Sequence, residues 1–247
     1  MTREAVGVVA VLLGVPAYYG LVAAPLNGRL AGALLGRSSF GRRLPRMDAE
    51  ALARTAVGGV TQLLAMLALA TVAGLGWHDF VPEDWHPELI GYGVLLGVGE
   101  IGLSSFLVSL SMRLAVAVAR PGGGDRREDW TAMSTGGWMR AFLTTVRVAP
   151  PAVAAALVVL YIAVEETVYR GVVIGALRPY GAAAALLASV TLFMLAQTFN
   201  MPSWRNALPP LTAAVVVGLT HGLLLLQVGD ITPLIAAHVV LFAMALV

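Results

Sequence analysis

The stretch Val164-Glu165-Glu166-Thr167-Val168-Tyr169-Arg170-Gly171 decides how this chain folds. It places two carboxylates and a guanidinium inside the otherwise apolar run from Pro151 to Leu177. Ionisable side chains at membrane depth are costly unless they are paired or face water, so they usually mark a functional site. The run therefore predicts a helix that packs against other helices around a polar interior.

On a helix, the spacing of these charges gives the two glutamates different surroundings. Glu166 and Arg170 are four residues apart with the acid first, which is the favourable order for an ion pair. Glu165 lies about 100° round the helix from Glu166 and has only Tyr169 at the same spacing. We expect the arginine to hold one carboxylate while its neighbour stays free for chemistry. The alternative is that all three charges merely satisfy one another in a helix bundle.

The composition is that of an integral membrane protein, with 58% hydrophobic residues, 12% charged residues and a mean hydropathy of +0.82. The 247 residues leave room for about six to eight spanning helices of ~20 residues each. There is no cysteine, which excludes disulfides, thiolate nucleophiles and cysteine metal sites. All 16 basic residues are arginine, so lysine catalysis is excluded as well.

The apolar runs predict an all-α polytopic membrane bundle of about seven transmembrane helices. The expected spans are Ala5–Leu26, Arg54–Trp77, Leu89–Leu114, Pro151–Leu177, Ala182–Met201, Leu211–Val228 and Thr232–Val247. A secretory signal is the alternative for the first run, which is too long and too weakly basic at its flank. We expect Asn27–Glu50 to be a loop, and Pro202, Pro209 and Pro210 to punctuate a connection.

Loop charges predict the orientation and the domain boundaries. The arginine-rich segment 27–50 is expected inside, and the acidic connection His78–Glu88 outside, by the positive-inside rule. A glycine-rich, arginine-bearing stretch predicts a cytoplasmic linker at 120–140, between N-terminal helices at 1–119 and a core at 141–247. The abundance of Ala, Val, Gly and Arg without lysine is typical of a high-GC bacterial gene, which predicts a multi-pass protein of the bacterial inner membrane.

Four polar residues in other spans are further candidates: Glu100, Gln197, His221 and His238. A histidine can act as acid, base or metal ligand, although an isolated buried imidazole more often bonds a backbone carbonyl. A sheltered carboxylate near a histidine is the minimum set for activating water against a peptide carbonyl. We expect Glu100 either to act directly or to bond Ser104, Ser105 or a neighbouring helix. Simple alternation of the spans places Gln197 on the opposite side of the membrane from Glu165 and His238.

Three pieces of sequence together resemble a known membrane family. They are Glu165-Glu166-x-x-x-Arg170, the stretch from Phe193 to Gln197, and Pro233-Leu234-Ile235-Ala236-Ala237-His238. In this order they are similar to the CAAX prenyl endopeptidases and bacteriocin-processing enzymes (the Abi or CPBP family), which are glutamate-type intramembrane proteases. The resemblance covers the chain from about Pro150 to the C-terminus. It implies that Glu165 activates water, that Glu166 and Arg170 shape the site, and that His238 holds the water or the oxyanion.

The chain departs from this family at two motifs. The second motif of the family is Phe-x-x-x-His, and Gln197 stands where that histidine belongs. The third is His-x-x-x-Asn, and Phe242 occupies the asparagine position. Glutamine cannot shuttle a proton and phenylalanine cannot donate to an oxyanion; losing one such donor costs about 10²–10³ in rate. Gln197 still offers an amide N–H, and His221 or Asn200 are candidates to fill the gap.

These observations predict an intramembrane endopeptidase that cleaves a hydrophobic peptide or a membrane-anchored protein. The expected site residues are Glu165, Glu166, Arg170, Gln197 and His238. Membrane lipid is an expected partner and nucleic acid is not; no cofactor is expected, and a metal on one histidine and two glutamates is not required. One alternative is a catalytically degenerate member that acts as an immunity factor or partner subunit. Another is a transporter with Glu100, Glu165 and His238 as a proton relay, which requires Glu100 to face the same cavity.

Overall fold

The computed structural model describes residues 2–23, 25–37, 44–84, 86–119, 138–199, 201 and 203–245, and the part described is helical, without β-strands. The α-helices are α1 (Arg3–Ala17), α2 (Leu26–Arg37), α3 (Arg46–Ala73), α4 (Glu88–Ala119), α6 (Trp138–Val148), α7 (Pro151–Glu166), α8 (Gly175–Leu177), α9 (Ala182–Thr198), α10 (Trp204–Val228) and α11 (Thr232–Ala245). Two π-helical stretches, η1 (Tyr18–Ala23) and η4 (Thr167–Ile174), continue α1 and α7, and two short 3₁₀ turns are η3 (Trp77–Asp79) and η5 (Arg178–Tyr180). The all-α prediction is confirmed.

The lengths and surfaces of these helices are those of a polytopic membrane protein. Among the described residues, five helical segments are long and apolar enough to cross a membrane: Arg3–Gly36, Arg46–Ala73, Glu88–Ala115, Pro151–Tyr180 and Asn206–Val228. Two shorter apolar helices, Ala182–Thr198 and Thr232–Met244, lie where the other two spans were predicted. Large apolar side chains face outward, with Leu64, Leu95 and Phe106 exposed by 61%, 70% and 65%. Lipid is the solvent that suits such a surface.

Two expected connections are helical instead. The loop predicted at Asn27–Glu50 is wrong, because α2 occupies Leu26–Arg37 and α3 already begins at Arg46. The Leu and Ala residues of α2 are strong helix formers, and the charge of its arginines concealed that tendency. Pro209 and Pro210 lie inside α10 rather than in a turn. They lie in its second turn, where each proline removes one backbone hydrogen bond of the helix without ending it.

The predicted linker falls mainly outside the described residues. Residues 120–137 are not described, and neither is Asn200; Arg140 belongs to α6. The division into domains at 1–119, 120–140 and 141–247 stays a prediction, and so does the orientation of the loops.

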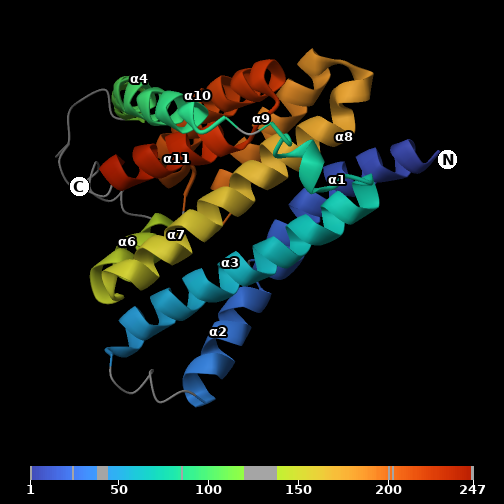
Figure 1. The fold of residues 1–247 in the computed structure, drawn as a ribbon. Coiled ribbons are helices and arrows are strands. Elements are labelled where there is room, and N and C mark those ends of the chain that lie inside the picture. Colours follow the sequence, from blue (N-terminus) through green and yellow to red (C-terminus); the bar gives the residue numbers. More distant parts are fainter. Residues whose placement is uncertain are drawn as a thin grey trace.

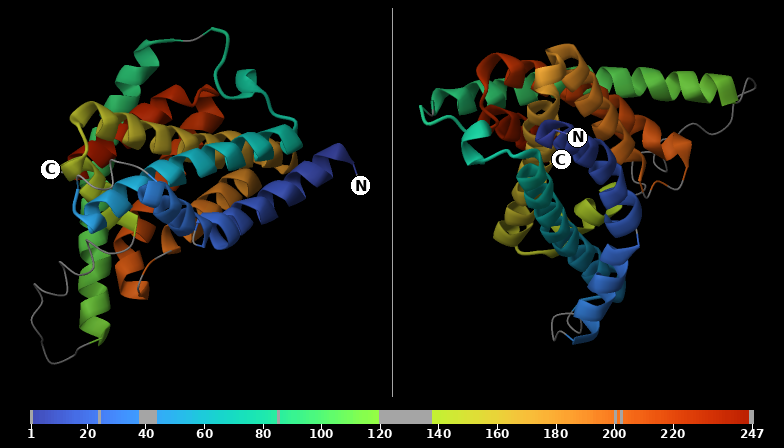
Figure 2. Two further views of the ribbon diagram at one scale, coloured as in Figure 1. Left: turned by 90° about the horizontal axis from the view of Figure 1, so that it is seen from below. Right: turned by 90° about the vertical axis from the view of Figure 1, so that its right-hand side faces the viewer.

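Helix α7 and its continuation η4 occupy the middle of the molecule. Figure 1 shows α1, α2 and α3 on one side of α7, and α4, α10 and α11 on the other; the views in Figure 2 agree. α3 packs on α1, α2, α6 and α7, while α9 packs on α10 and η4. The ionisable residues of α7 and η4 are therefore enclosed by helices from both halves of the chain.

The contact between α4 and α11 depends on two glycines. A Cβ atom added to Gly93 would lie 2.2 Å from the carbonyl oxygen of Pro233, and one added to Gly97 would lie 2.4 Å from that of Ala237. Real Cβ atoms do not approach backbone this closely, so only glycine allows the two helices to touch here. This approach sets the position of His238, the residue that follows Ala237.

We expect Gly97→Ala to destabilise the fold by about 1–3 kcal/mol, because the added methyl group must push α4 away from α11. Gly99→Ala on the same helix is the matched control, since a Cβ there meets nothing within 4 Å. It should be neutral or stabilising by up to about 1 kcal/mol, because alanine favours the helix. Thermal unfolding in detergent, followed by circular dichroism, measures both. Equal midpoints for the two variants would contradict the close packing.

Candidate functional site

A local change in helix type positions the charged residues. α7 ends at Glu166, and the chain continues for one wide π-helical stretch from Thr167 to Ile174. The Thr167 hydroxyl donates to the Ala163 carbonyl at 2.8 Å, and Ser189 of α9 donates to the Tyr169 carbonyl at 2.7 Å. These side chains satisfy backbone acceptors where the helical hydrogen bonding is irregular. Stretches of π-helix are uncommon and are frequent at functional sites.

Glu166 and Arg170 form the ion pair that their spacing predicted. Both side chains are fully buried, and Arg170 Nε lies 3.4 Å from Glu166 Oε2. The guanidinium carbon also lies 4.4 Å from the centre of the Phe193 ring, a cation–π contact. Phe193 is the aromatic residue of the second motif, so its ring stabilises the arginine of the first.

Two histidines converge on the same carboxylate. His238 Nδ1 lies 2.6 Å from Glu166 Oε1, and His221 Nδ1 lies 3.0 Å from Glu166 Oε2. The other ring nitrogen of His221, Nε2, is 3.2 Å from Glu100 Oε2, while the hydroxyl of Thr220 donates to Glu100 Oε1. A continuous buried network therefore links α4, α10, α7 and α11.

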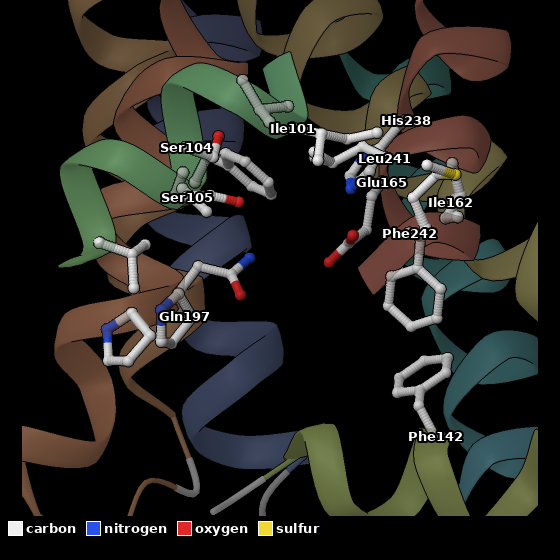
Figure 3. Close-up of a pocket in the computed structure, with 18 of the residues that line it drawn as sticks. Ile101, Ser104, Ser105, Phe142, Ile162, Glu165, Gln197, His238, Leu241 and Phe242 are labelled. Atoms are coloured by element: carbon white, nitrogen blue, oxygen red, sulfur yellow. The ribbon is translucent and has the colours of Figure 1, made fainter. Parts of the chain in front are cut away.

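Glu165 is outside this network and faces a cavity. The cavity measures about 330 Å³, and Figure 3 shows the Glu165 carboxylate pointing into it from one wall and Gln197 from the opposite wall. His238 lies beside Glu165 on the cavity wall. Within the described part of the chain, no hydrogen bond or ion pair engages the Glu165 carboxylate or the Gln197 amide. Both groups are therefore available to water or to a bound molecule.

The cavity is lined mainly by apolar side chains. Ile101, Ile162, Leu241 and Phe242 line it, and Phe242 packs edge-on against Phe142 with ring centres 5.4 Å apart. A second cavity of about 370 Å³ is lined by Tyr18, Tyr19, Asn27 and Arg54 among others. Glu165 and Gln197 line both cavities and so stand where an apolar space meets a more polar one.

The structure brings together the residues that the sequence singled out, and it differs from the predicted position of Gln197 across the membrane. Placing Gln197 on the opposite side of the membrane from Glu165 and His238 was wrong, because all three line one cavity. Simple alternation fails because it gives every helix the same length and no tilt, whereas α9 has only 17 residues and α11 only 14.

The roles of Glu100 and His221 were the part that sequence reasoning did not resolve. Of the partners expected for Glu100, the neighbouring helix is the one found. The proton-relay alternative required Glu100 to face the same cavity. Glu100 is not among the residues that line it. His221 lies between Glu100 and Glu166. The sequence indicated only that Glu100 and His221 are ionisable residues within apolar spans.

One group of described residues is close enough to hold a metal ion: Glu166, His221 and His238, whose ligand atoms lie within 4.8 Å of one another. This set of possible metal ligands has two histidines and one glutamate, whereas the sequence suggested one histidine and two glutamates. Two ligands of a tetrahedral zinc ion lie roughly 3.3 Å apart. The 2.6 Å contact between His238 and Glu166 is shorter, and the Arg170 cation adjoins the same carboxylate. The arrangement is that of side chains bonded to one another.

Comparison with protein families identifies the second half of the chain. Residues 147–244 match the model of the type II CAAX prenyl endopeptidases, described as Rce1-like. Residues 147–244 are therefore similar to this family, and we refer to them as the Rce1-like domain. The resemblance noted from the sequence motifs is thereby confirmed. Comparison with curated proteins found no match, and comparison with solved structures found none either. The Rce1-like domain contains Glu165, Glu166 and His238, whereas Glu100 on α4 lies outside it.

The buried ion pair should contribute far more to stability than an exposed pair of the same spacing. We expect Arg170→Gln to cost about 3–5 kcal/mol, because it leaves the Glu166 carboxylate without its guanidinium. Arg54→Gln is the matched control: Arg54 pairs with Glu50 at 2.6 Å, also four residues apart, with side chains 53% and 39% exposed. It should cost at most about 1 kcal/mol.

Unfolding in detergent, or the amount of protein that accumulates in membranes, measures the difference between the two arginine variants. An Arg170→Gln protein that is as stable as Arg54→Gln would show that the Glu166 charge is neutralised by other groups.

Proposed function

We propose that this chain is an intramembrane endopeptidase that hydrolyses a peptide bond with water activated by Glu165. The observation that carries the proposal is the Glu165 carboxylate, which has no hydrogen bond or ion pair among the described residues and faces a sheltered cavity beside an oriented histidine. A carboxylate held away from bulk water can take a proton from a bound water as the water oxygen attacks the peptide carbonyl. The proton then passes from Glu165 to the departing amine, and no covalent intermediate forms.

His238 is oriented for this task by Glu166. Its Nδ1 faces Glu166 Oε1 at 2.6 Å, which assigns the ring proton to that nitrogen and leaves Nε2 as an acceptor. His238 also lines the cavity, so its free nitrogen can hold the attacking water against Glu165. In metal sites, carboxylates that do not touch the metal orient the metal-bound histidines by the same kind of hydrogen bond.

Gln197 faces Glu165 from the opposite wall of the cavity. Its amide N–H can donate to the oxyanion that develops on the carbonyl oxygen. Phe242 cannot take part and instead packs on Phe142. With a single amide donor, the enzyme should be slower than relatives with two donors, by about 10²–10³ for the missing one.

The walls of the cavity favour a hydrophobic substrate. An apolar space of about 330 Å³ that ends at Glu165 suits apolar side chains or a lipid anchor better than a charged peptide. We therefore propose a hydrophobic peptide or a membrane-anchored protein as substrate, in the inner membrane of a bacterium, without nucleic acid or a required cofactor.

One observation favours a second function. Phe242 fills the place of a polar donor and is held there by the Phe142 ring, so the apolar wall of the cavity extends to this position. A degenerate family member could use this wall to grip a hydrophobic peptide without cleaving it, as an immunity factor or partner subunit.

Glu165→Gln separates the two functions, because it removes the base and keeps the shape of the side chain. In membranes of the native host, mass spectrometry of small membrane peptides and lipoproteins should show an uncleaved precursor in this variant and its product in wild type. We expect the product to fall by at least about 10²-fold. Glu83→Gln, at a carboxylate 85% exposed and far from the site in sequence, is the control and should process normally.

Identical peptides from wild type and Glu165→Gln would contradict the protease. A peptide-resistance or assembly phenotype that a deletion loses and Glu165→Gln retains would then establish the binding function.

A further inference from the structure

His221 occupies a position that the activity proposed above does not explain. It comes from α10, is completely buried and lies with each ring nitrogen against a different carboxylate. Nδ1 is 3.0 Å from Glu166 Oε2, and Nε2 is 3.2 Å from Glu100 Oε2. A ring placed between two acids differs from the usual buried histidine, which donates from one nitrogen and accepts at the other.

The contacts determine where the protons lie. An ionised carboxylate has no hydrogen to give, so each nitrogen that faces one must itself carry a proton. Glu100 has a polar partner at each oxygen: the Thr220 hydroxyl donates to Oε1, and His221 Nε2 lies 3.2 Å from Oε2. Its two oxygens are thus surrounded as those of an ionised carboxylate are. With both acids ionised, His221 is an imidazolium that hydrogen-bonds Glu100 through Nε2 and places its Nδ1 3.0 Å from Glu166 Oε2.

This charge state balances the buried cluster. Glu100 and Glu166 contribute two negative charges, and Arg170 and His221 contribute two positive ones. His238 can then remain neutral, with its Nδ1 proton directed at Glu166 and Nε2 free as an acceptor. Without the His221 charge, two buried carboxylates would share one guanidinium, and an uncompensated buried charge is strongly unfavourable. The cluster would then take up a proton, and either Glu166 would become neutral or His238 would become charged.

We propose that His221 is a positively charged positioning residue, held by Glu100, that keeps Glu166 ionised and His238 neutral beside the reacting carbonyl. Its part in catalysis rests on the proposed peptidase function; its charge state does not. The proposal also gives α4 a part in the site, although α4 lies outside the Rce1-like domain.

Nitrogen-15 NMR of histidine-labelled protein in detergent at about pH 7 tests the charge state directly. The chain has 4 histidines, and those in the loop, His78 and His86, are 77% and 62% exposed in their side chains. We expect His221 to show two protonated ring nitrogens and His238 one. His221→Gln and His238→Gln assign the signals. An unprotonated nitrogen on His221 would overturn the proposal.

A double-mutant cycle tests the role in the reaction. His221→Gln keeps a polar side chain but removes the charge, and should lower kcat by about 10–100-fold with little change in KM. Glu100→Gln removes a negative charge, so His221 releases its second proton and the cluster stays neutral with Glu166 balanced by Arg170. This variant should cost less than about threefold. The double variant restores neutrality and should return to within about threefold of Glu100→Gln. A purely structural role predicts a double variant at least as impaired as His221→Gln.

The control for this cycle is His86→Gln, which removes a histidine that also contacts a glutamate, Glu88 at 3.1 Å, but on the exposed surface. Activity here means the Glu165-dependent product found by mass spectrometry, so the two proposals fail separately. Cleavage that survives Glu165→Gln refutes the peptidase mechanism. Glu165-dependent cleavage that is unaffected by His221→Gln refutes the positioning role alone.

Discussion

The structure depends on the neutralisation of one buried carboxylate. Glu166 has no solvent exposure, and a charge in that position is tolerable only with partners of opposite sign or with donors at both oxygens. Arg170 supplies the charge, and two imidazoles reach the oxygens from α10 and α11. Because these partners come from different helices, the requirement to satisfy one side chain specifies how the helices of the second half assemble.

The remaining features of the fold make that assembly possible. The π-helical stretch after Glu166 carries Arg170, whose cation lies over the ring of Phe193 on α9. Glycines on α4 let α11 approach closely enough for His238 to reach Glu166. Glu100 lies on the same helix as these glycines and contacts His221. One helix from the first half of the chain thus both packs against the site and enters its hydrogen-bond network.

This organisation separates a rigid network from a reactive group. Glu166 is enclosed by Arg170, His221 and His238, whereas Glu165, its neighbour in sequence, faces a cavity and has no hydrogen bond or ion pair among the described residues. Gln197 lies across the cavity from Glu165 and is placed to meet a carbonyl oxygen from the other side. The chemistry that remains is that of a single base, an oriented histidine and an amide, within apolar walls.

The sequence by itself determined the membrane class, the position of the seven apolar helices, the Glu166–Arg170 ion pair and the family motifs. These follow from composition and from local spacing, which depend only on neighbouring residues. It did not predict that α2 is helical or that Pro209 and Pro210 lie within α10, since weak local preferences there compete with packing. Only the tertiary structure decided that Gln197 shares a cavity with Glu165, and that Glu100 and His221 complete the network. Those relations depend on helix tilt, helix length and close approach at glycine, and no sequence spacing encodes the distance between residues on different helices.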